Sequence, residues 1–99
     1  MATLQEVLNP SKNLKRTTLT LTNASTAYLA PTTELSGRTV VYILNNNASA
    51  ILYWGDSTVT GVANGLPINP GAKEVFAVSG GLYLASPTAA ATALIVEMS

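Results

Sequence analysis

Apolar and polar residues alternate with a period of two in two long segments of the chain. Between residues 15 and 22, Leu19 and Leu21 are separated and flanked by threonines. This spacing puts the leucines on one face of a strand and the threonines on the other. From Thr92 to Met98, large apolar residues again occupy every second position. Both segments are therefore predicted to be β-strands, the first with one face in solvent.

Two further strands are predicted at 38–45 and 50–54, where apolar residues occupy both faces instead of alternating with polar ones. The turn between them, 46–49, contains two asparagines, which tolerate a positive φ, so the two strands are expected to form a hairpin. An antiparallel strand with one wet face should alternate apolar and polar residues. Both faces of these strands are therefore expected to be covered, by the N-terminal segment or by another subunit.

The rest of the chain shows short strand patterns separated by turn residues. Strands are expected at 26–30, 73–79 and 82–85, and the segment 55–71 is expected to be a long loop because glycines and prolines punctuate it. About seven short strands with regular turn signals are typical of an antiparallel sandwich or a small barrel. The sequence therefore predicts an all-β fold, an antiparallel β-sandwich or small barrel.

The N-terminal residues 1–14 differ from this pattern and are interpreted as an arm, with the sandwich domain over residues 15–99. Thr3 and Glu6 match a capping box at a helix start, and Pro10 stops the helix soon afterwards. Such a short helix is not stable alone, so it must dock on something; the alternative is a frayed chain end. The apolar anchors of a docked arm would be Leu4, Val7 and Leu8.

The composition excludes most kinds of catalytic site. A chain of 99 residues forms one domain with a thin core. It contains no Cys and no His, so it has no disulfide framework, no thiolate metal site and no imidazole general base or zinc ligand. No enzyme activity and no cofactor or metal site is predicted.

Charge is scarce. The formal net charge is zero and 10% of the residues are charged, against about 25% in an average domain, so binding to nucleic acid is not expected. A surface this poor in charge is usually covered by a partner. Four of the five basic residues precede Thr39, which is compatible with an anionic partner: Lys12, Lys15, Arg16 and Arg38. No apolar run approaches the length that spans a bilayer and no signal-peptide pattern is present, so we expect no membrane association and assembly in a cytoplasm.

The segment Gly55-Asp56-Ser57 superficially resembles the nucleophile block of serine esterases. Ser57 would need a base, and without His the segment is better explained as a turn that Asp56 caps through hydrogen bonds to the backbone. Asp56 with Asn64 and Asn69 matches no calcium-loop pattern. A carbohydrate-binding face made from the strand aromatics remains the alternative kind of site.

Several stretches together resemble small β-sandwich virion proteins of tailed phages, over roughly residues 38–98. They are Tyr53-Trp-Gly-Asp-Ser-Thr-Val-Thr60, Asn64-Gly-Leu-Pro-Ile68, Pro70-Gly71, Gly81-Leu-Tyr-Leu-Ala85 and the strand end Val96-Glu97. In those proteins a strand ends in a Gly-Asp-Ser turn and a Pro-Gly turn precedes the next strand. Such segments occur in capsid decoration (cement) proteins, head fibres and tail components, and the resemblance carries no catalytic or ligand residues.

The resemblance and the two-faced apolar strands favour a non-enzymatic virion protein. We expect it to oligomerise, to attach to the outside of the capsid and to stabilise the shell by bridging major capsid protein subunits; the resemblance alone favours a trimer. The alternative is a tail or head-fibre module that binds a host receptor or glycan, which would require an exposed aromatic cluster around Tyr53 and the loop 55–71. The candidate interface residues are Leu4, Val7, Leu8, Tyr42 and Tyr53.

Overall fold

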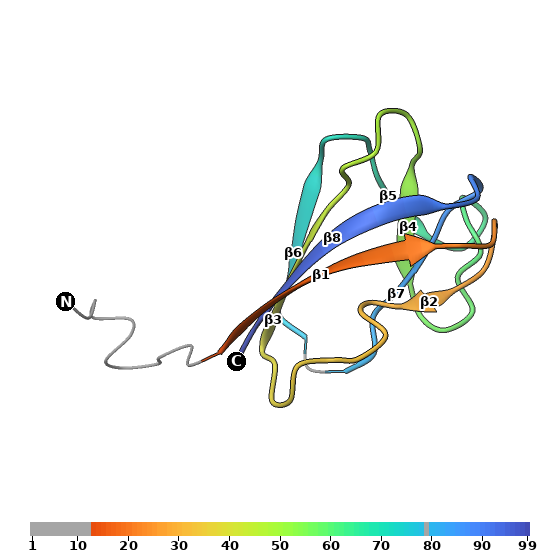
Figure 1. Cartoon of the computed structure of the whole chain (residues 1–99). Coiled ribbons are helices and arrows are strands. Elements are labelled where there is room, and N and C mark those ends of the chain that lie inside the picture. Colours follow the sequence, from red (N-terminus) through yellow and green to blue (C-terminus); the bar gives the residue numbers. More distant parts are fainter. Residues whose placement is uncertain (1–12, 79) are drawn as a thin grey trace.

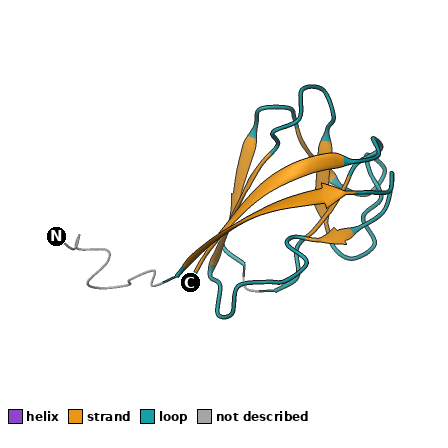
Figure 2. Cartoon of the chain, in the orientation of Figure 1, coloured by secondary structure: helices purple, strands orange, loops and turns teal. Residues whose placement is uncertain are grey.

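The computed structural model describes residues 13–78 and 80–99, which form two antiparallel sheets packed face to face (Figures 1 and 2). In chain order the strands are β1 (Leu14–Leu21), β2 (Tyr28–Leu29), β3 (Val40–Leu44), β4 (Leu52–Gly55), β5 (Leu66–Ile68), β6 (Lys73–Phe76), β7 (Tyr83–Ala85) and β8 (Ala91–Met98). The first sheet has the order β1-β8-β3-β6, and the second has the order β2-β7-β4-β5. The predicted all-β sandwich is therefore confirmed.

The strand count exceeds the prediction because β5 lies inside the segment that was expected to be one long loop. β5 pairs with β4, with Leu52 opposite Ile68 and Tyr53 opposite Pro67. Pro67 has no backbone N–H to donate, and it is tolerated because β5 is an edge strand. One of the prolines that predicted a loop, Pro67, thus lies in the edge strand of the second sheet.

The predicted hairpin between β3 and β4 is wrong, because the two strands belong to different sheets. Asn45, which follows β3, is fully buried, and its side-chain Nδ2 donates to the carbonyl oxygens of Ala50 (2.8 Å) and Ile68 (2.7 Å). Its Oδ1 accepts from the backbone N–H of Asn47 (3.0 Å). The bonds to Ala50 and Asn47 satisfy backbone groups of the segment that crosses between the sheets, and the bond to Ile68 joins this segment to β5.

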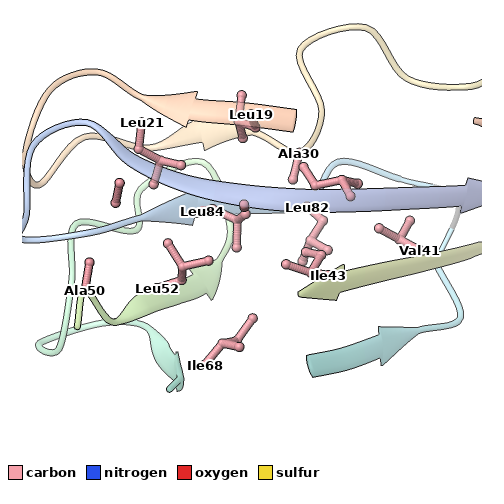
Figure 3. Close-up of a cluster of buried hydrophobic side chains, with 13 residues drawn as sticks. Leu19, Leu21, Ala30, Val41, Ile43, Ala50, Leu52, Ile68, Leu82 and Leu84 are labelled. Atoms are coloured by element: carbon pink, nitrogen blue, oxygen red, sulfur yellow. The ribbon is translucent and has the colours of Figure 1, made fainter. Parts of the chain in front are cut away.

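The core lies between the two sheets and is built from every second residue of the long strands. In β8 the buried positions are Ala91, Ala93, Ile95 and Glu97, and the positions between them are half-buried. Figure 3 shows the apolar cluster, to which β1 contributes two leucines and β4 and β7 contribute one each from the opposite sheet: Leu19, Leu21, Leu52 and Leu84. Burying each of these leucines stabilises the fold by about 1.5–3 kcal/mol.

One end of the sandwich contains a buried ion pair. Arg38 is 2% exposed and Glu97 is fully buried; the Arg38 Nη1 lies 3.0 Å from a Glu97 carboxylate oxygen. Arg38 also donates to Glu34 (2.8 Å) and to the carbonyl oxygens of Ala30 (2.8 Å) and Gly80 (2.6 Å). Arg38 is therefore part of the interior, and its inclusion among the basic residues available to an anionic partner is wrong.

The predicted N-terminal arm lies almost entirely outside the described residues, which begin at Asn13. The proposed helix and its anchors Leu4, Val7 and Leu8 fall in that part of the chain. β1 begins at Leu14, one residue before the predicted start of the sandwich domain.

Candidate interaction surface

The turn after β4 is stabilised from within the turn. The Asp56 carboxylate accepts hydrogen bonds from the Thr58 hydroxyl and from the Thr58 backbone N–H (2.9 Å). The bond from the hydroxyl, followed by the bond from the N–H, lowers the pKa of Asp56 below its ordinary value of 3.8. The Asp56 cap inferred from the sequence is confirmed, and it accounts for the Gly-Asp-Ser segment without a ligand.

Residues 59–65, which follow this turn and which we call the covering loop, fold over the outer side of the second sheet. Val59 is 1% exposed and packs with Tyr53 and Ala85 in a small cluster separate from the main core. Gly65 makes this packing possible, since a Cβ at that position would lie 2.7 Å from Val59 Cγ2 and 2.8 Å from Tyr53 Cβ. The second sheet is thus covered on its outer side by the chain itself.

Asn64 fixes the shape of this covering loop. Its Oδ1 accepts from the backbone N–H of Thr60 (2.9 Å), and its Nδ2 donates to the carbonyl oxygen of Thr58 (2.8 Å). The side-chain amide is therefore engaged with the loop backbone. Within the described ranges there is no group of three or more His, Cys, Asp or Glu side chains that could hold a metal ion, and those residues form no pocket.

The first sheet has a different outer side. Its strand register places apolar side chains in rows across β1, β8, β3 and β6: Val96 pairs with Tyr42, which pairs with Val75, and Leu94 pairs with Leu44. At one end of the sheet, Met98 pairs with both Val40 and Leu14. We call this set the outer apolar face: Leu14, Val40, Tyr42, Leu44, Val75, Leu94, Val96 and Met98.

None of the described residues covers the outer apolar face. Its members on β3 and β8 are half-buried, and none of its eight residues belongs to either apolar cluster of the fold. Toward the edge strands the exposure rises, to 61% for Val75 and 69% for Leu14. A contiguous apolar sheet face of this kind is a candidate interaction surface.

Two cations lie on the outer apolar face. Arg16 on β1 is opposite Val96, and Lys73 on β6 is opposite Leu44. The Lys73 Nζ lies 6.0 Å from the centre of the Tyr42 ring, a distance at which a cation is attracted to the ring face. The face is therefore an apolar surface with positive charge on each side.

The two aromatic residues proposed as interface candidates occupy different environments. Tyr42 lies in the central row of the outer apolar face, whereas Tyr53 is 8% exposed beneath the covering loop. We therefore place Tyr42, and not Tyr53, on the surface proposed to contact a partner.

Most members of the outer apolar face were not identified from the sequence. Its largest contribution comes from the alternate residues Leu94, Val96 and Met98 of β8. The positions between them are mostly apolar as well, Ala93 and Ile95 among them. A strand that is apolar on both faces does not show which face the core occupies.

Comparison with protein-family models, with curated proteins and with solved structures gave no match to this chain. The structure defines the class as an all-β sandwich of two four-stranded antiparallel sheets. No helix of the length and apolarity needed to cross a membrane occurs in the described part of the chain.

Proposed function

We propose that the chain is a non-enzymatic structural protein of a virus particle, which oligomerises and attaches to the outside of the capsid. In this role it stabilises the shell by bridging major capsid protein subunits, as decoration proteins do. The observation that carries the proposal is the outer apolar face, an apolar sheet surface that no described residue covers. A small domain that leaves such a surface free in isolation is suited to work in an assembly.

Two further observations support an assembly role. The four strands of the first sheet span the outer apolar face as one continuous, hydrogen-bonded surface, which is stiff and needs little ordering when a partner binds. The turn segments that resemble phage virion proteins form the covering loop and the strands beneath it, so they stabilise the domain behind the contact surface. The preference for a trimer continues to rest on that resemblance alone.

The direct test compares particles assembled with and without this protein. We expect purified protein to sediment with shells that lack it, to occupy their outer surface in electron micrographs, and to raise the temperature at which they release their contents. A chain that remains a monomer at micromolar concentration and does not sediment with shells would contradict the proposal.

The alternative, a fibre module that binds a receptor or glycan, requires an exposed aromatic cluster around Tyr53. The Tyr53 side chain packs against Val59 and Ala85, so the described structure offers no such cluster at that place. Binding of the protein to a glycan array, abolished by Tyr53→Ala in a variant that remains folded, would restore this alternative.

A further inference from the structure

The charges on the outer apolar face have one sign in the part of the chain that the structure describes. Arg16 and Lys73 occupy positions on this face. The carboxylates of the same four strands occupy positions that face the other way: Glu97 is fully buried, and Glu74 is paired with the buried Ile43. A partner that covers the face therefore meets cations and no anions.

The two cations lie on opposite sides of the apolar rows. Arg16 is on edge strand β1 and Lys73 on edge strand β6, which are three strand spacings, or about 14 Å, apart across the sheet. The Lys73 ammonium lies over the Tyr42 ring. A partner that buries Tyr42, at the centre of the face, must therefore also remove water from this ammonium.

This charge pattern disfavours contact of the face with the same face of a second copy of the chain. Two copies related by a two-fold axis would press the same patch against itself, so each copy would bring Arg16 and Lys73 into an interface that holds no carboxylate. Removing a charge from water without an opposite partner is unfavourable, and like charges across an interface add further repulsion. The apolar contacts of the face would be largely offset.

We infer that the outer apolar face binds a different protein, whose contact surface has an apolar centre flanked by carboxylates that meet Arg16 and Lys73. Under the proposed function, on which this identification of the partner rests, that protein is a capsid subunit. Between backbone positions the face spans about 14 Å across three strand spacings and about 13 Å along β8, the four-residue rise from Leu94 to Met98. Because a standard interface buries about 800 Å² per partner, each copy is expected to bind weakly.

Charge reversal on the face tests the inference with the shells described above. We expect Arg16→Glu and Lys73→Glu each to weaken sedimentation with shells about ten-fold at low salt, and the wild-type protein to bind less tightly as salt is raised. The control is Val62→Glu, which adds a carboxylate at a position that is 79% exposed on the loop that covers the other sheet. Its binding should stay within about two-fold of wild type, because its charge lies outside the contact.

The oligomeric state supplies the second measurement. Val75→Lys adds a charge at an exposed position of the face, so it should reduce shell binding but leave the sedimentation coefficient of the free protein unchanged. If the wild-type protein is an oligomer and the Val75→Lys protein is a monomer, the face is a contact between copies and the inference is wrong. Shell binding that neither Arg16→Glu nor Lys73→Glu weakens also overturns it, while leaving the proposed function intact.

If wild-type protein does not bind shells, the proposed function fails and a random peptide library displayed on phage decides the inference separately. Peptides selected by the wild-type protein and not by Val75→Lys are then expected to combine apolar residues with Asp or Glu. A selection without an excess of acidic residues, or with none that depends on Val75, would overturn it.

Discussion

Replacing Arg38 by Met should destabilise the fold more than any single surface change. Arg38 makes four side-chain hydrogen bonds, to Ala30, Glu34, Gly80 and Glu97. Its replacement removes all four and leaves the Glu97 carboxylate fully buried. Among the described residues, the other hydrogen bond to that carboxylate comes from the Leu35 backbone N–H (2.9 Å).

The size of the effect follows from the burial of the pair. Breaking a buried ion pair by removing one partner costs about 3–5 kcal/mol, because the remaining charge is left uncompensated in the interior. A domain of this size has a total stability of about 5–15 kcal/mol. At about 4–8 °C per kcal/mol, the melting temperature should fall by roughly 12–40 °C.

Urea denaturation followed by Trp54 fluorescence measures this loss, and Arg16→Met is the matched control. Arg16 undergoes the same change of side chain but is exposed on β1, so the free energy of unfolding should change by no more than about 0.5 kcal/mol. If Arg38→Met costs less than about 1 kcal/mol, the ion pair does not hold this end of the sandwich together and the reasoning fails.

Three smaller changes test other parts of the fold. Gly65→Ala should lower the melting temperature and reduce the free energy of unfolding by about 1–3 kcal/mol, because the added methyl group overpacks the covering loop. Gly80→Ala is the control, since nothing lies within 4 Å of its new Cβ, and should leave the melting temperature unchanged. Equal effects of the two changes would contradict the close packing at Gly65. Asn45→Ala removes the side-chain donor to the carbonyl oxygens of Ala50 and Ile68 and should cost about 2 kcal/mol or more in chemical denaturation. The exposed Asn46→Ala should cost much less, and a loss for Asn45→Ala no larger than this would show that the crossing does not depend on the buried amide. The folded-state pKa of Asp56 is lowered, so its contribution to stability is present above the ordinary pKa of 3.8 and is lost as the pH falls through the lower folded value. Asp56→Asn should therefore flatten the dependence of stability on pH below about pH 4, and an unchanged slope in urea midpoints measured across that range would refute this.

The two sheets differ in how their outer faces are covered. Apolar residues on both faces of a strand require cover on both sides. In the second sheet Val59 and Gly65 let the chain's own loop cover Tyr53. In the first sheet no described residue does this, and the outer apolar face is left available to a partner.

The sequence by itself determined the fold class and most of the strands. Period-two alternation depends only on neighbouring residues along one strand, so β1 and β8 were predicted close to their observed bounds. The cap at Asp56 is likewise local, because its partner Thr58 is two residues away. The absence of Cys and His, which excludes thiolate and imidazole groups, needs no structure at all.

Only the tertiary structure decided which strands pair and which face is left free. The short segment between β3 and β4 predicted a hairpin, but the two strands lie in different sheets. The buried Asn45 amide stabilises the crossing through its hydrogen bonds to Ala50 and Ile68. The partners of Arg38 include Glu97, 59 residues away along the chain, and no local pattern reveals such a contact. The same holds for the outer apolar face, because its rows are formed by cross-strand neighbours distant in sequence, and their register is set when the core packs.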